Sequence, residues 1–232
     1  MTAALRLQAL RVGTARPLDG AGPVSAIAKA PVAEPLWLGP EGFAGDEQGN
    51  RRHHGGPEKA VHHYPYDHYP FWRETLPGPP AVLAESGAFG ENLATEGLTE
   101  ADVCIGDTFR LGEAVVQVSQ GRQPCRTLNA RFGVADMARR VQDSGRTGWY
   151  YRVLEPGEVA PDARLELLDR RHAHWPLARL LRGLFHQPYN LAELDQMVEL
   201  PELADSWRAL LRRRLETGEV EDWSRRLGEK TG

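Results

Sequence analysis

The sequence predicts a mainly β domain followed by a small, purely helical unit. Up to about Asp169, short apolar segments alternate with turns, and the chain carries 24 glycines and 17 prolines. Short strands at such intervals favour a closed barrel or a sandwich. After Asp169 the apolar residues recur with the 3.6-residue period of a helix. We therefore expect a β domain over residues 1–169 and a three-helix bundle over residues 170–232.

The expected strands follow one another along the first domain. Residues 108–111 and 114–118 flank Gly112, which predicts a hairpin. One helix, over residues 135–142, is expected to interrupt the series and to stop at Gly145. The remaining expected strands are residues 5–12, 25–30, 103–105, 150–154 and 164–168.

Three apolar stripes predict the helices of the tail. Pro176 begins the first, Asn190 and Glu193 resemble a capping box at the start of the second, and Gly218 ends the third. A bundle this small is marginal alone, so we expect it to pack against the β domain or against a second subunit of a homodimer. Its expected core residues are Leu180, Leu184, Leu194, Trp207 and Leu211.

Composition and charge argue against several function classes. The formal net charge of −4 gives no support to a nucleic-acid polymer as partner. The basic run 212–214 favours a solvated helix face over an anionic partner, because Glu216 and Glu219 follow it. No signal-peptide pattern and no apolar run of membrane-spanning length is visible, so we expect a soluble cytoplasmic protein with no membrane contact.

Cys125 is the residue whose surroundings point most clearly to chemistry. It follows Pro124 and lies between Arg122 and Arg126. Cationic neighbours favour the thiolate, which is the nucleophile and the metal ligand. On these flanks alone the alternative stays open that Cys125 is a small buried apolar residue. Cys104 has apolar neighbours and no adjacent cation, so we expect it only to pack.

Five of the eight histidines lie between His53 and His68, which raises the alternative of a histidine–metal hydrolase carrying zinc or iron. The His-Glu-x-x-His signature is absent from this stretch. If residues 60–64 form a strand, His62 and His63 point to opposite faces and cannot share one metal ion.

Two glycine-containing segments each have two interpretations. Gly55 and Gly56 either supply positive φ at a turn or let backbone N–H groups approach a phosphate or pterin, with Lys59 as the cation. Glu91 and Asn92 either stabilise their own loop or hydrogen-bond the edge of a pterin.

Four segments in this order carry a family resemblance: Gly45-Asp46, residues 53–65, residues 89–93, and the Pro124-Cys125 turn. With the helical tail they resemble the YiiM-type bacterial members of the MOSC domain family, which is related to the C-terminal part of molybdenum cofactor sulfurases. The resemblance covers nearly the whole chain. It implies a MOSC β-barrel with a few helices, followed by the three-helix bundle.

The resemblance also implies a site for the molybdenum cofactor, of the molybdopterin type. Cys125 would ligate molybdenum as a thiolate, a soft ligand that suits a metal already held by two pterin sulfurs. His54 is the expected acid, because its ordinary pKa suits proton delivery near neutral pH. At the level of the family alone, an association with pyridoxal phosphate is implied as well. The implied cofactor-binding residues are Gly55, Gly56, Lys59, His63, Glu91, Asn92, Ser119 and Arg122.

The implied activity is the reduction of small N-hydroxylated compounds, such as hydroxylaminopurine-type base analogues and amidoximes. The chain has no cysteine cluster for iron–sulfur ligation and no Gly-x-Gly-x-x-Gly fingerprint, so electrons must come from a separate reductase protein. A non-catalytic carrier of the molybdenum cofactor or of sulfur remains the alternative, because a carrier needs the same thiol and the same binding residues.

Overall fold

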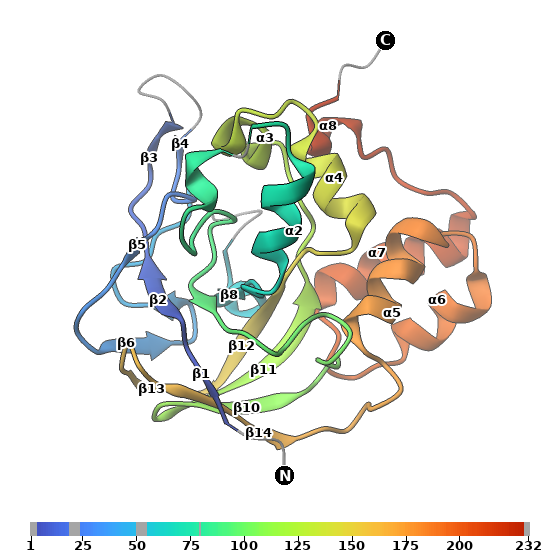
Figure 1. Ribbon diagram of the computed structural model, residues 1–232. Coiled ribbons are helices and arrows are strands. Elements are labelled where there is room, and N and C mark those ends of the chain that lie inside the picture. Colours follow the sequence, from blue (N-terminus) through green and yellow to red (C-terminus); the bar gives the residue numbers. More distant parts are fainter. Residues whose placement is uncertain (1–3, 19–23, 50–54, 79, 230–232) are drawn as a thin grey trace.

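The computed structural model describes residues 4–18, 24–49, 55–78 and 80–229. Its centre is a curled sheet of nine strands, ordered β1-β14-β10-β11-β12-β8-β9-β2-β5 (Figure 1). The pairs are antiparallel except for β8 with β9. The bounds are β1 Leu5–Arg6, β14 Arg164–Asp169, β10 Thr108–Leu111, β11 Ala114–Gly121, β12 Trp149–Glu155, β8 Val61–His63, β9 Leu93–Ala94, β2 Ala9–Val12 and β5 Ala30–Pro31.

Two smaller sheets flank the main one. They consist of β13 (Gly157–Val159), β6 (Leu36–Gly39) and β7 (Gly42–Phe43), and of β3 (Arg16–Pro17) with β4 (Val24–Ser25). The expected mainly β fold with a helical C-terminal region is therefore confirmed.

Strand β11 is the central element of the core. All eight of its residues are buried, so both faces of the strand are covered. The expected hairpin is present, with β10 pairing to β11 in the register Leu111 to Ala114. At the far end of β11, a Cβ on Gly121 would lie 2.9 Å from Leu181 Cδ2 and 3.2 Å from Trp207 Cη2. The absence of a side chain there lets the helical tail approach the strand.

Three helices cover a hydrophobic cluster beside the sheet that includes Trp72, Leu128 and Val141. They are α2 (His68–Thr75), α3 (Thr127–Phe132) and α4 (Met137–Ser144). Only α4 was expected, and it begins two residues later than its apolar pattern suggests and runs up to Gly145, which has positive φ. Helices α2 and α3 were missed because eight and six residues give too short a periodic signal. Short 3₁₀ turns occur at η2 (Pro57–Lys59) and η3 (Ala81–Leu83).

Three strand predictions need correction. Residues 5–12 form two strands, β1 and β2, separated at Leu7 and Gln8. Residues 25–30 are extended only at their ends, in β4 and β5. Residues 103–105 do not form a strand: Cys104 makes only an isolated β-bridge to Pro176, and the chain then turns, with the backbone N–H of Cys104 donating to Asp107 Oδ2 at 2.8 Å.

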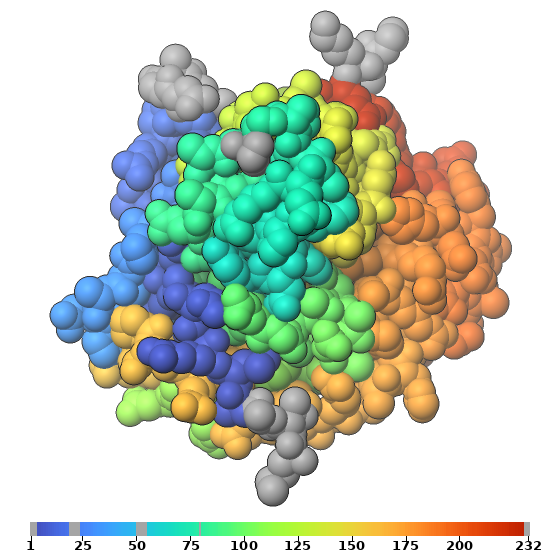
Figure 2. All heavy atoms as spheres, viewed as in Figure 1, coloured from blue at the N-terminus to red at the C-terminus, as the bar shows by residue number. Residues whose placement is uncertain are grey.

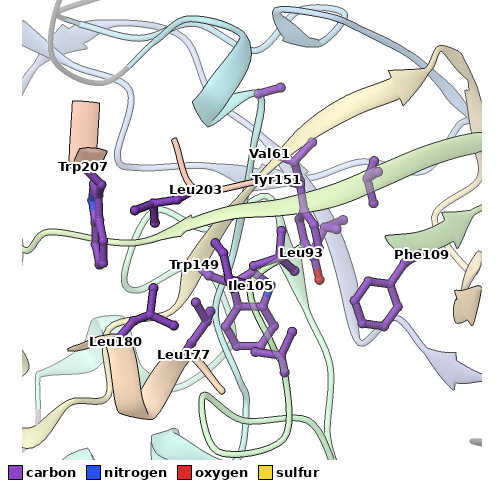
Figure 3. Close-up of a cluster of buried hydrophobic side chains, with 14 of the residues drawn as sticks. Val61, Leu93, Ile105, Phe109, Trp149, Tyr151, Leu177, Leu180, Leu203 and Trp207 are labelled. Carbon is purple, nitrogen blue, oxygen red and sulfur yellow. The ribbon is translucent and has the colours of Figure 1, made fainter. Parts of the chain in front are cut away.

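The helical tail packs against the sheet. It comprises α5 (Leu177–Leu181), which continues as the π-helical turn η4 (Arg182–His186), then α6 (Leu191–Val198) and α7 (Asp205–Thr217). Leu177, Leu180 and Trp207 belong to the same buried cluster as Trp149 and Tyr151 of β12 (Figure 3). In the space-filling view the tail covers one flank of the molecule and α2 covers the face beside it (Figure 2).

The last helix leaves the bundle. Helix α8 (Ser224–Leu227) lies beside α3 and α4, apart from α5 to α7 (Figure 1). Within the residues that the structure describes, no helix has the length and apolar character needed to cross a membrane.

Candidate functional site

Cys125 lies in a turn between the central strand and a helix. Strand β11 ends at Gly121, and the backbone N–H of Arg122 then donates to the carbonyl oxygen of Gly148 at 3.0 Å. The carbonyl oxygen of Cys125 accepts from the N–H of Leu128 at 2.9 Å, which starts α3. Cys125 is half-buried, whereas Cys104 is buried. Burial and the nearby Asp107 raise the pKa of the Cys104 thiol, which leaves it protonated and inert at neutral pH.

Arg122 is a buried cation with unused hydrogen-bonding capacity. Its side chain is 6 % exposed, and its Nη1 has no hydrogen-bond partner among the described residues. It hydrogen-bonds the hydroxyl of Tyr150, whose pKa is raised by burial and lowered again by the charge of Arg122. Tyr150 also interacts electrostatically with Cys125. Arg122, Tyr150 and Cys125 therefore form one cluster.

His62 joins this cluster from β8. Its ring packs against Tyr150 with 5.0 Å between centroids, and it hydrogen-bonds the backbone of Gly90. Burial, reinforced by the charge of Arg122, lowers the pKa of His62 well below its usual value, so the ring is neutral. Its Nε2 is buried and has no partner in the described part of the chain. An uncompensated buried polar atom is costly, which makes Nε2 a candidate contact for a ligand.

His63, which was expected to bind the cofactor, points into the core. Its ring nitrogens lie 3.0 Å from Tyr151 Oη and 2.9 Å from Thr95 Oγ1. Burial lowers the pKa of His63 to about 3. The two-residue period of the strand separated His62 from His63 correctly, but the structure places His62, and not His63, beside the cysteine turn.

Glu91 and Asn92 hydrogen-bond within the protein. Glu91 is fully buried and accepts from Tyr69 Oη at 2.5 Å and from the N–H groups of Gly87 and Phe89 at 2.5 and 3.0 Å. Asn92 is 3 % exposed, and its side chain is bonded to the backbone of His62 and of Arg11. This geometry favours the loop-stabilising interpretation of both residues over contact with a pterin.

The Gly45-Asp46 segment is tied to the same network. Asp46 Oδ2 accepts from Asn92 Nδ2 at 2.9 Å, and Asp46 Oδ1 accepts from the N–H of Gly13 at 2.8 Å and pairs with the buried Lys29. Burial lowers the pKa of Lys29. Three of the four segments that carried the resemblance thus meet here, and together they hold the strand that presents His62. Lys29 and Tyr150 were missed, since no local pattern distinguishes them.

The Gly55–Lys59 turn lies against β11 and β12. Ser119 Oγ donates to the carbonyl oxygens of Glu58 at 2.7 Å and Tyr150 at 3.1 Å, so Ser119 tethers the turn and is itself buried. Gly56 has φ +94°, and a Cβ built on it would meet no atom of the described residues within 4 Å. Its positive φ requires glycine, and the space beside it leaves the backbone open to a ligand.

Lys59 completes this turn as a half-buried cation, and burial lowers the pKa of its ammonium group. Gly55 is also half-buried. His54, the expected acid, lies outside the described residues, so its role stays a prediction.

Arg226 of α8 also contacts the cysteine turn. Its guanidinium donates to the carbonyl oxygen of Pro124, and it interacts electrostatically with Cys125. Burial lowers the pKa of Arg226 to about 10, which still leaves it cationic at neutral pH. This contact comes from outside residues 1–169, because the chain returns to the cysteine turn after the bundle.

Among the described residues, no group of three or more histidine, cysteine, aspartate or glutamate side chains could hold a metal ion by itself. Cys125 therefore belongs to no such group within the part of the chain that the structure describes. Six buried side-chain nitrogens of the described residues have no partner, and two of them, Arg122 Nη1 and His62 Nε2, lie in this cluster. With the soft thiol and the cations, these two fit an anionic, sulfur-ligated metal cofactor.

Comparison with known proteins identifies two matching family models. Residues 50–166 match the MOSC domain, and residues 175–218 match the YiiM-like, 3-alpha helix domain. YiiM of Escherichia coli is 42 % identical over 209 residues, which is 90 % of this chain and 92 % of that protein. YflK of Bacillus subtilis is 48 % identical over 191 residues, covering 82 % of this chain and 85 % of that protein.

A longer relative carries the name "Reductase". This Gibberella moniliformis protein is 38 % identical over 178 residues, which is 76 % of this chain but only 31 % of that protein. The crystal structure of Escherichia coli YiiM superimposes with a TM-score of 0.81 at 34 % identity, covering 96 % of this chain and 98 % of that one. None of these names or domain descriptions mentions pyridoxal phosphate.

Proposed function

This chain belongs to the MOSC domain family, in its YiiM-like group, and on that basis we propose that it is a molybdenum-cofactor-dependent reductase of small N-hydroxylated compounds. The expected substrates are hydroxylaminopurine-type base analogues and amidoximes. Support for a reductase, at the coarser level of reaction class, comes from the name of the Gibberella moniliformis relative.

One observation carries the proposal. The half-buried Cys125 lies in a cluster where Arg122 Nη1 and His62 Nε2 are buried without partners among the described residues. Buried polar atoms are rarely left uncompensated, so these two nitrogens are best explained by a ligand that supplies acceptors. Cys125 would ligate the molybdenum, and Arg122, His62 and Lys59 would hold the remainder of the cofactor. The backbone of Gly55 and Gly56 would approach its phosphate.

The net reaction breaks one N–O bond. R–NHOH takes up two electrons and two protons and yields R–NH₂ and water. The bound cofactor would supply the two-electron redox chemistry. The chain would supply cations and a way to deliver protons. The Tyr150 hydroxyl interacts electrostatically with Cys125 and is hydrogen-bonded by Arg122, so it is our candidate proton donor.

The electrons would come from a separate donor protein of the reductase class. In the Gibberella moniliformis relative, the matched region is less than a third of the chain, so the remainder has room for further domains. A homologous segment within a longer "Reductase" supports the idea that a MOSC domain receives electrons from a partner module.

A carrier of the cofactor or of sulfur remains the second candidate, because the same thiol and cations would serve it. The test is turnover of 6-hydroxylaminopurine and benzamidoxime by protein from a molybdate-fed host, with reduced viologen as the electron source. Molybdenum-dependent release of the amine supports the reductase. Molybdenum without turnover, or sulfane sulfur on Cys125, would point to the carrier. Stoichiometric zinc or iron without molybdenum would point to a histidine–metal hydrolase.

A further inference from the structure

The C-terminal segment is built onto the turn that carries Cys125. Arg226 bridges two parts of the β domain: its Nη1 donates to the carbonyl oxygen of Pro124 and its Nη2 to Gln142 Oε1 at 2.5 Å. The carbonyl oxygen of Arg226 in turn accepts from the N–H of Arg126 at 2.7 Å. The residues before and after Cys125 are therefore both bonded to Arg226.

Neighbouring contacts hold this segment in place. Asn129 Nδ2 donates to the carbonyl oxygen of Leu227 at 2.8 Å, and Glu229 pairs with Arg139 at 2.8 Å. Gly228 has φ +77°, and a Cβ built there would lie 2.8 Å from Arg126 Cβ. The close approach requires glycine and leaves the segment little freedom to shift along α3.

The two adjacent arginines of α8 differ in surroundings. Arg225 is exposed, whereas Arg226 is half-buried and lies over the Phe185 ring at 5.7 Å. The segment lies beyond residues 175–218, which match the three-helix domain. The contact is therefore a separate feature of the chain and does not follow from the bundle itself.

We propose that Arg226 is a positioning residue of the candidate site, which fixes the Pro124–Cys125 turn and places a second cation beside the thiol so that anionic groups are favoured there. The cation supplied by α8 adds to that of Arg122. This role adds to the proposed function that the group bound at Cys125 is anionic. It rests on that function only in treating Cys125 as the ligand-binding residue.

The charge is tested by alkylation of Cys125 in full-length protein from a host that cannot make the cofactor. Iodoacetate and iodoacetamide differ in charge, and mass spectrometry separates Cys125 from Cys104. The rate constant for the anionic iodoacetate, divided by that for the neutral iodoacetamide, should fall by roughly threefold or more in Arg226→Gln, because the cation that attracts the anion is lost. Arg225→Gln should keep the wild-type ratio. An unchanged ratio in Arg226→Gln, or an equal fall in Arg225→Gln, overturns the assignment of the cation.

The positioning is tested with a variant that keeps the charge. Arg226→Lys cannot reach both acceptors with a planar fork, so amide hydrogen exchange of residues 125–129 should rise about tenfold while the alkylation ratio stays near wild type. Arg225→Lys is the matched control. Exchange as slow as in the wild type would overturn the positioning role, even if Arg226→Gln fails to fold. Both measurements use cofactor-free protein, so their outcome is separate from molybdenum content and turnover.

Discussion

The backbone N–H of His62 donates to Asn92 Oδ1 at 3.0 Å, and the N–H of Asn92 donates back to the carbonyl oxygen of His62 at 2.8 Å. This pair of bonds joins β8 to the segment before β9, where both residues are almost fully buried. Asn92 Nδ2 donates in addition to the carbonyl oxygen of Arg11 and to Asp46. Asn92 thus supports the cluster indirectly, by holding the strand that presents His62.

The first prediction is that Asn92→Ala destabilises the protein by about 2–4 kcal/mol, because it leaves the His62 N–H and the Arg11 carbonyl oxygen buried and unpaired. Urea unfolding measures the loss. A variant as stable as the wild type that still loses molybdenum would contradict this, and would instead show that Asn92 contacts the cofactor directly.

The second prediction concerns Arg122. In cofactor-free protein, Arg122→Gln should leave the unfolding free energy unchanged or higher, because it removes a buried cation whose Nη1 has no partner in the described chain. Molybdenum content should nevertheless fall. Arg152→Gln gives the contrast: Arg152 pairs with Glu58 at 2.6 Å, and its loss should lower stability. A large destabilisation by Arg122→Gln would mean that its role is structural.

The third prediction is a pH dependence of stability caused by His63. Its folded pKa of about 3 lies below the ordinary value of 6.5, so the unfolded state binds the proton more tightly. The free energy of unfolding is therefore unaffected by protonation of His63 above pH 6.5. It falls as pH drops from 6.5 to 3, by at most about 3–5 kcal/mol. Unfolding in urea at several pH values should show this loss. His63→Gln should remove its share of this loss and leave the share of His62, whose pKa is also lowered by burial, whereas the exposed His174→Gln should not reduce the loss.

The fourth prediction concerns the packing of the bundle against the sheet. Trp207 is 1 % exposed and faces Gly121 of β11, so Trp207→Ala should cost about 3–5 kcal/mol through the cavity it leaves. Trp37 is 56 % exposed, and Trp37→Ala should change stability by at most about 0.5 kcal/mol. Thermal melts of both variants provide the comparison. Equal, small effects would mean that the bundle is dispensable for the stability of the β domain.

The parts of the fold that were predicted correctly have strong local signals. The β10–β11 hairpin has Gly112 at its turn, and the three apolar stripes of the tail became α5, α6 and α7. Residues 103–105, which have only an isolated β-bridge at Cys104, were predicted as a strand because their apolar side chains satisfy the same pattern. Their conformation depends on a hydrogen bond from the Cys104 N–H to Asp107, which no periodicity reveals.

The candidate site was predictable only in part, for a physical reason. The thiol of Cys125 and the neighbouring Arg122 are close in sequence, so their association could be predicted directly. Which other residues join the cluster depends on which strand face meets which neighbour. That packing brings in His62 rather than His63, together with Tyr150 and Arg226. Arg226 is 101 residues from Cys125. Such pairings are determined by tertiary packing and leave no pattern in the linear sequence.

The central claim is that Cys125 is a ligand of molybdenum, and X-ray absorption at the molybdenum edge tests it most directly. Wild-type protein and Cys104→Ser should both show one more sulfur ligand than the two of the pterin. Cys125→Ser should show only two sulfurs, and any molybdenum it retains should give no reductase turnover. The same sulfur count in Cys125→Ser as in the wild type would contradict the account.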